Sequence, residues 1–127
     1  MNKTKILIIE DENAIVNLLT RILENRGYEV ASACDGIEGL SKVNSFKPAL
    51  VLLDVNMPRI DGLQLLEQLK ASPETQQIPV VMCTARARID DAEAALGLGA
   101  EGYIIKPFVT ERLLSKIKDV LDSHKIP

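Results

Sequence analysis

Short apolar runs alternate along this chain with longer segments in which apolar residues recur every three or four positions. The short runs are residues 5–10, 28–33, 49–54, 80–84 and 102–106. Their length and their content of Val, Ile and Leu predict strands, most of them buried on both faces of a parallel sheet. The longer segments predict amphipathic helices. In the second of them, the apolar positions are Ile37, Leu40, Val43 and Phe46.

Glycine, proline and threonine residues mark where these helices are expected to begin and end. Gly27 and Gly99 follow the first and fourth helical segments, at positions where a helix commonly closes. Pro48 and Pro73 stop the second and third segments. Thr110 is the expected N-cap of the last helix, because its hydroxyl can accept a hydrogen bond from a free N–H of the first turn.

Five strands that alternate with five helices predict an α/β fold, in which helices cover both faces of one parallel sheet. Right-handed crossovers leave few topologies, and we expect the flavodoxin-like strand order 2-1-3-4-5. This order places the first and third strands side by side at the switch point, where open parallel sheets bind ligands outside the carboxyl ends of their strands. The expected organisation is a single domain over residues 1–127, with no output domain.

Composition narrows the possible functions. Lys and Arg total 15 against 18 Asp and Glu, and the formal charge of -3 gives no support for a nucleic-acid surface. No apolar run approaches the roughly 20 residues that span a bilayer, and the N-terminus lacks the features of a signal peptide, so the expected compartment is the cytoplasm. His124 is the only histidine, and Cys34 and Cys83 have no partner at metal-ligand spacing, which argues against a zinc site or a Cys/His nucleophile.

Charged residues stand at the ends of three of the apolar runs. Glu10 and Asp11 end the first, Asp54 ends the third, and Lys106 ends the fifth. If these strands are neighbours, the three carboxylates converge, and like charges oppose joint ionisation unless a cation compensates. A cluster of carboxylates without His or Cys suits Mg²⁺. The alternative is that these acids only end strands and cap the following helices.

Two further residues extend this edge. Thr84 ends the fourth run and can offer a hydroxyl, and Pro107 makes the Lys106–Pro107 peptide bond a candidate for the cis form. A carboxylate nucleophile, metal-binding acids, a cation and a hydroxyl together fit phosphoryl transfer through an acyl phosphate on an aspartate.

The motifs ILIIEDE, LVLLDVNMPRIDG, VVMCTA and GYIIKPF, in this order, resemble the receiver domain of two-component response regulators, including stand-alone chemotaxis regulators. The resemblance covers essentially all 127 residues. It implies a signalling switch rather than a classical enzyme. Asp54 would accept a phosphoryl group from the phosphohistidine of a histidine kinase or phosphotransfer protein, or from a small acyl phosphate. The reaction would depend on Mg²⁺, which Mn²⁺ can replace.

The same resemblance assigns roles around the acceptor. Asp11 would be a direct Mg²⁺ ligand beside Asp54, with Glu10 acting through water and Asn56 offering its backbone carbonyl. Lys106 would reach a phosphoryl oxygen. Receivers often carry Asp where Glu10 stands, so the longer side chain is a mild departure from the pattern.

Switching and phosphoryl lifetime are implied for a second set of residues. Thr84 and Tyr103 match the switch pair, Ala85 the small residue that leaves access to the phosphate, and Arg86, with Asn56, a position that tunes the lifetime. If Tyr103 lies beside Thr84, inward movement of the hydroxyl makes room for the ring. The face of the fourth helix, fifth strand and fifth helix would then bind a downstream protein or a second copy. The alternative for Tyr103 is a half-buried aromatic residue without a switching role.

Two rival functions fit less well. A small Mg²⁺-dependent phosphatase with an aspartate nucleophile needs a second acid two residues further on, where Asn56 stands. A flavin-binding electron carrier needs a first turn that cradles phosphate, but the sequence EDENA is acidic and lacks Ser, Thr and Gly. Within the switch class, a stand-alone protein and the receiver part of a longer DNA-binding regulator both stay open.

Overall fold

The computed structural model describes residues 3–124; residues 1, 2 and 125–127, which belong to the expected 1–127 domain, lie outside the described residues. Strands and helices alternate along the described chain, as predicted. The strands are β1 (Lys5–Ile9), β2 (Glu29–Ala33), β3 (Leu50–Leu53), β4 (Val80–Thr84) and β5 (Gly102–Ile105). The helices are α1 (Asn13–Glu24), α2 (Gly36–Phe46), α3 (Gly62–Ala71), α4 (Ile89–Gly97) and α5 (Thr110–Ser123).

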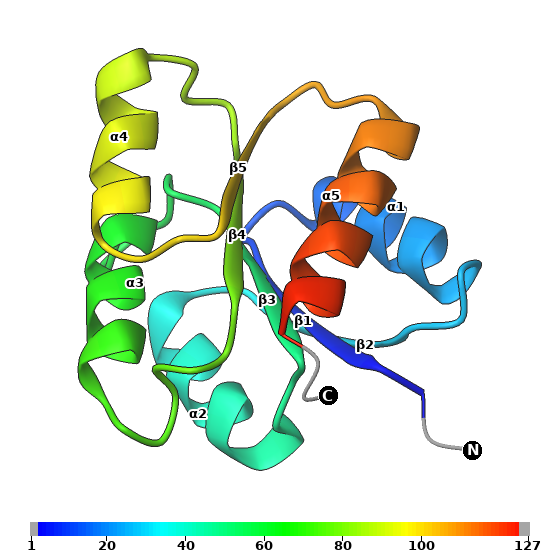
Figure 1. The fold of residues 1–127 in the computed structure, drawn as a ribbon, viewed down its shortest axis with the longest axis horizontal. Coiled ribbons are helices and arrows are strands. Elements are labelled where there is room, and N and C mark those ends of the chain that lie inside the picture. Colours follow the sequence, from blue (N-terminus) through cyan, green and yellow to red (C-terminus); the bar gives the residue numbers. More distant parts are fainter. Residues whose placement is uncertain (1–2, 125–127) are drawn as a thin grey trace.

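The strands form one parallel sheet in the order β2-β1-β3-β4-β5, which confirms the flavodoxin-like prediction. In the register of the central strands, Ile8 of β1 pairs with Ser32 of β2 and Leu52 of β3. Figure 1 shows α2, α3 and α4 on one face of the sheet and α1 and α5 on the other. All strands therefore end in the same direction, and the polar residues that follow them share one edge.

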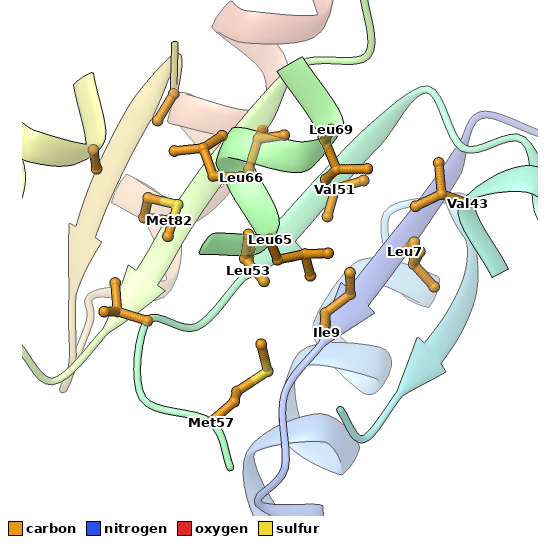
Figure 2. Close-up of a cluster of buried hydrophobic side chains, with 14 of the residues drawn as sticks. Leu7, Ile9, Val43, Val51, Leu53, Met57, Leu65, Leu66, Leu69 and Met82 are labelled. Carbon is orange, nitrogen blue, oxygen red and sulfur yellow. The ribbon is translucent and has the colours of Figure 1, made fainter. Parts of the chain in front are cut away.

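Each face of the sheet has its own apolar core, because alternate strand residues point to opposite faces. Leu7 and Ile9 pack in the core under α2 and α3, together with Leu65 (Figure 2). Ile6 and Ile8 pack in the core under α1 and α5. Burial of one Leu or Ile side chain contributes about 1.5–3 kcal/mol, so the continuous apolar runs follow from two-sided burial.

The helix starts follow local hydrogen bonding, and one differs from the prediction. Asp61 caps α3 in a capping box, in which its Oδ1 accepts from the Gln64 N–H at 2.9 Å. The expected N-cap role of Thr110 is wrong, because Val109 is the N-cap of α5 and no side chain caps this helix. The N–H of Leu113 donates to the Val109 carbonyl at 3.1 Å, so the first turn starts one residue earlier than the sequence suggested.

Gly62 brings the start of α3 directly against the end of β3. A Cβ at this position would overlap the Asp54 carbonyl oxygen and would lie 2.7 Å from the Val55 Cα. The Gly62 N–H also donates to the Val55 carbonyl at 2.8 Å. Only a residue without a side chain fits such a close approach of two backbones. The start of α3 therefore packs tightly against the backbone of Asp54 and Val55 and restricts its movement.

The lengths and hydropathy of the described helices bear on membrane insertion. None of them, over residues 3–124, is long and apolar enough to cross a bilayer. The Lys106–Pro107 peptide bond after β5 is cis, as the sequence had suggested.

Candidate functional site

Three carboxylates meet at the carboxyl edge of the sheet. Single carboxylate oxygens of Glu10, Asp11 and Asp54 all lie within 4.8 Å of one another. The side chains of Glu10 and Asp54 are buried, with 3% and 4% exposed, whereas Asp11 is exposed. The structure thus brings together the acids that the sequence placed at the ends of two different runs.

Backbone hydrogen bonds of the sheet continue one residue beyond the strands and fix these positions. The Glu10 N–H donates to the Ala33 carbonyl at 3.0 Å, and the Asp54 N–H donates to the Ile9 carbonyl at 3.1 Å. On the other side, the Lys106 N–H donates to the Thr84 carbonyl at 2.8 Å. The backbones of Glu10, Asp54 and Lys106 are therefore held by the sheet, although each residue follows its strand rather than belonging to it.

Lys106 is the cation of this pocket. Its Nζ lies 2.5 Å from Glu10 Oε1 and 3.5 Å from Asp54 Oδ2, and 11% of its side chain is exposed. A buried charge needs a partner of opposite sign, and Lys106 serves two buried carboxylates at once. With Asp11 included, three carboxylates face one ammonium group, so the pocket keeps an excess of negative charge.

Burial and the neighbouring charges together shift the pKa values of the buried pair Glu10 and Lys106. Burial raises the pKa of Glu10 to about 7, and the negative charge of Asp54 adds to this, against the hydrogen bond from Lys106. For Lys106, burial lowers the pKa, but the hydrogen bond to Glu10 and the charge of Asp54 outweigh burial and leave the pKa above its ordinary value. Lys106 is thus positively charged at neutral pH, while Glu10 is near its titration midpoint.

The donor set fits a small hard cation. It offers carboxylate oxygens from three residues, and one of them, Asp11, is exposed at the mouth. Mg²⁺ binds one or two carboxylates, keeps several waters and completes its shell with phosphate oxygens, which a half-open pocket permits. The residues that could hold it are Asp11 and Asp54, and the Asn56 carbonyl is close in the chain. Glu10 is buried beside these two acids.

Asn56 and Thr84 are both hydrogen-bonded to Arg86, which lies in the β4–α4 connection. The Asn56 N–H donates to Asp54 Oδ1 at 3.2 Å, and its side-chain Oδ1 accepts from Arg86 Nε at 2.7 Å. Thr84 is fully buried, and its Oγ1 accepts from the Arg86 N–H at 3.3 Å. Ala85, between Thr84 and Arg86, is exposed.

Comparison with known protein families matches residues 6–118 to the response regulator receiver domain. The chain belongs to this family. Receiver domains are the signal-receiving parts of two-component response regulators, so the resemblance seen in the four sequence motifs is confirmed, together with the fold that it implied.

Relatives of known function are longer than this receiver. The chain is 40% identical over 126 residues to the alkaline phosphatase synthesis transcriptional regulatory protein PhoP of Bacillus subtilis (strain 168), covering 99% of this chain and 51% of PhoP. It is 38% identical over 117 residues to the DNA-binding dual master transcriptional regulator RpaA of Synechocystis sp., covering 92% of this chain and 48% of RpaA. The receiver therefore spans about half the length of these relatives.

Solved structures agree over nearly the whole receiver. A CheY-like response regulator receiver domain protein from Methanospirillum hungatei JF-1 superposes with a TM-score of 0.90 at 35% identity, covering 97% of each chain. The signal receiver domain of a histidine kinase from Syntrophus aciditrophicus gives a TM-score of 0.89 at 33% identity, covering 98% of this chain and 94% of that one.

The position of Tyr103 in this receiver differs from a direct pairing with Thr84. Tyr103 pairs with Met82 across β4 and β5, whereas Thr84 pairs with Ile105. Tyr103 and Thr84 are therefore diagonal neighbours on the same face of the sheet. The Tyr103 hydroxyl donates to the Arg86 carbonyl at 2.9 Å, so the two switch candidates are linked through the Arg86 backbone.

Sequence reasoning on this receiver missed the partners of Arg86. The resemblance implies only that Arg86 tunes the phosphoryl lifetime, and the structure shows that its side chain is paired within the chain. Its Nε bonds to Asn56, and its Nη1 lies 3.7 Å from Asp91 Oδ1 in α4. No motif signals these contacts, because they join the β3–α3 connection, the β4–α4 connection and helix α4.

Proposed function

We propose that this receiver is a phosphorylation-dependent switch in which Asp54 accepts a phosphoryl group from a histidine kinase or a phosphotransfer protein. The observation that carries the proposal is the placement of the Asp54 carboxylate. It is buried, lies among two further acids, and has the Lys106 Nζ 3.5 Å from its Oδ2. Phosphoryl transfer depends mainly on positioning and on neutralisation of charge, and these neighbours supply both.

The proposed transfer makes and breaks one bond each. An Asp54 carboxylate oxygen forms a bond to phosphorus while the bond from phosphorus to the donor's imidazole nitrogen breaks, and the imidazole nitrogen keeps the electron pair. Lys106, already beside Asp54, offsets the negative charge on the transferring oxygens. When bound, Mg²⁺ (or Mn²⁺) would neutralise further charge on those oxygens. Asp11, Asp54 and the Asn56 carbonyl would hold the ion, with Glu10 acting through water.

Dephosphorylation returns the switch to its starting state. A water attacks phosphorus, inorganic phosphate leaves, and the Asp54 carboxylate is restored. We assign Ala85, Arg86 and Asn56 to the control of this step, because Arg86 and Asn56 are joined beside Asp54 and Ala85 leaves the neighbouring surface open. The protein is then a self-modifying signal carrier and not an enzyme that turns over an external substrate.

The proposed output surface is the face of α4, β5 and α5. Phosphorylation adds strong acceptor oxygens, which would draw the Thr84 hydroxyl away from the Arg86 N–H and so disturb the contact of Tyr103 with Arg86. Four large apolar side chains of α4, β5 and the N-cap of α5 are exposed: Ile89 at 73%, Leu96 at 51%, Ile105 at 44% and Val109 at 56%. Exposed apolar residues gathered in this way suit a downstream protein or a second copy of the chain.

A second candidate concerns only the context of the switch. Because the chain spans about half of PhoP and RpaA, it can act as the receiver part of a longer DNA-binding regulator, rather than as a single domain over residues 1–127. The chemistry at Asp54 is the same in both cases. The formal charge of -3 favours protein partners over direct contact with nucleic acid for this part.

The proposal is tested by intact mass after incubation with Mg²⁺ and acetyl phosphate or phosphoramidate. We expect a gain of one phosphoryl group, which is lost in Asp54→Asn and without divalent cation. Asp35→Asn is the control, because Asp35 also follows a strand but is not one of the three clustered acids, and Asn can replace it as the N-cap of α2. If the wild-type protein gains no mass from any such donor, or if Asp54→Asn is still modified, the proposal is wrong.

A further inference from the structure

Arg86 links the acceptor to helix α4 through a continuous chain of polar contacts. Asp54 Oδ1 accepts from the Asn56 N–H at 3.2 Å, and Asn56 Oδ1 accepts from Arg86 Nε at 2.7 Å. The Nη1 of the same guanidinium lies 3.7 Å from Asp91 Oδ1 in the first turn of α4. Four residues thus connect the carboxylate that would be phosphorylated with a helix of the proposed output surface.

The backbone of Arg86 is anchored separately from its side chain. Its N–H donates to Thr84 Oγ1 at 3.3 Å, and its carbonyl accepts from the Tyr103 hydroxyl at 2.9 Å. The Arg86 side chain is 41% exposed and the Asp91 side chain 22% exposed, so the guanidinium has room to exchange one partner for another. In the unmodified protein, the contacts of the Arg86 backbone are therefore separate from those of its side chain, and the side chain can change partners on its own.

Arginine side chains in proteins are always charged. The partner of Arg86 is therefore decided by which anion is stronger and nearer. In the unmodified protein that anion is the single charge of Asp91, in a pair longer than an ideal charged hydrogen bond. A phosphoryl group on Asp54 would bring close to two negative charges and three strong acceptor oxygens to the pocket whose edge Arg86 already touches through Asn56.

We propose that Asp91 is a positioning residue that holds Arg86 toward α4 while Asp54 is unmodified and releases it to the phosphoryl group when that group forms. The inference rests on the proposed function of Asp54. It adds a second connection from the acceptor to α4, carried by an ion pair that breaks, beside the one through Thr84 and Tyr103. Removal of the Asp91 charge takes away a competitor for Arg86 and so favours the phosphoryl-bound state.

The test compares Asp91→Asn with Asp90→Asn. Both substitutions remove one negative charge from the first turn of α4, so they change the interaction with the helix dipole alike. Asp90, however, pairs with Arg88 at 3.8 Å, in a contact that is more than 80% exposed on both sides and apart from the acceptor. Each variant is titrated with beryllofluoride, a phosphoryl mimic, in the presence of Mg²⁺, and binding is followed by the NMR signal of the Thr84 amide.

We expect Asp91→Asn to bind beryllofluoride about two- to fivefold more tightly than the wild type and Asp90→Asn, which is the range that a partly exposed ion pair can supply. Asp91→Glu should restore the wild-type affinity. In an Arg86→Ala background, Asp91→Asn should have no further effect, because the residue it acts through is gone. Matching thermal unfolding midpoints for Asp90→Asn and Asp91→Asn exclude a loss of folding as the cause.

Three results would overturn this inference. Equal affinities of Asp91→Asn and Asp90→Asn, with a wild type that binds normally, refute it while leaving the proposed function intact. An effect of Asp91→Asn that persists in the Arg86→Ala background shows that Asp91 acts through some other group. This result also refutes the inference and leaves the proposed function intact. A wild type that does not bind beryllofluoride at all refutes both the proposed function and the inference that rests on it.

Discussion

Both ends of the sheet carry a cluster of charged side chains, and the two clusters are balanced differently. At the amino end, Glu101 Oε1 accepts from the Val80 N–H at 3.1 Å and lies 3.5 Å from Lys70 Nζ, while its Oε2 lies 3.0 Å from His124 Nε2. Lys70 also donates to two backbone carbonyls, at 3.1 Å and 2.9 Å. At this end a single carboxylate has a partner for each of its oxygens.

At the carboxyl end, three carboxylates share Lys106. Here burial raises the pKa of Glu10, and the negative charge of Asp54 adds to it. The comparison separates two uses of the same residue types. A balanced cluster joins helices to the sheet, whereas a cluster with excess charge of one sign is prepared to bind something of the other sign.

The largest expected difference between the two ends comes from removal of the lysines. Lys106→Met leaves Glu10 and Asp54 buried without a cation, and we expect the free energy of unfolding at pH 8 to fall by about 3 kcal/mol. Lys70→Met should cost about 1 kcal/mol, because Glu101 keeps two other partners. Urea unfolding at pH 8 measures both. Equal losses would show that the two clusters are balanced alike.

Next in size is the effect of Asp11 on metal binding. Asp11→Asn should weaken Mg²⁺ binding by roughly tenfold or more, because a direct carboxylate ligand is lost. The free energy of unfolding without metal should stay the same or rise slightly, since repulsion among the acids decreases. Glu101→Gln is the control from the opposite end and should leave the Mg²⁺ affinity unchanged. A calorimetric titration decides this, and an unaltered affinity in Asp11→Asn would contradict its role as a ligand.

The smallest effect concerns the titration of Glu10 in metal-free buffer. Its pKa of about 7 in the folded protein lies above the ordinary value of 4.5, so between these values the folded state binds more protons than the unfolded state. The contribution of Glu10 to stability is therefore complete below pH 4.5 and is lost as the pH rises through 7.

We expect the unfolding free energy of the wild type, measured relative to that of Glu10→Gln, to fall by about 1–2 kcal/mol from pH 5 to pH 8. This is less than the full shift would give, because the pocket is open to solvent beside Asp11. Urea unfolding in the presence of a chelator, at several pH values, provides the measurement. A difference that does not vary with pH would mean that Glu10 titrates normally.

The acidic edge could be predicted from the sequence because it follows from topology. The central strands β1, β3 and β4 are buried on both faces, so the end of such an apolar run is visible in the sequence as the first polar residue, such as Asp54 after Leu53. Parallel strands then place these ends together without any knowledge of side-chain conformation. The same reasoning gave the strand order and the position of Lys106.

The remaining features depend on where side chains reach between connections, which periodicity does not encode. Arg86 bonds to Asn56, 30 positions away in the sequence, and only the shape of both loops brings them together. The Lys70–Glu101–His124 cluster is equally non-local. The N-cap of α5 was wrong for a related reason: Thr110 has the right chemistry, but the path of the chain from β5 makes Val109 the residue whose carbonyl accepts the first helical bond.

The contact at Gly62 gives the proposed switch a direction. The Asp54 carbonyl and the Val55 Cα lie directly against Gly62. The backbone at Asp54 therefore has no room to move toward α3 when a phosphoryl group is added. The opposite wall, from Thr84 to Arg86, is held by side-chain hydrogen bonds that can exchange. If one side of the site cannot move and the other can, the added phosphoryl group displaces the movable side. In this receiver the movable side is the β4–α4 connection, which leads to α4.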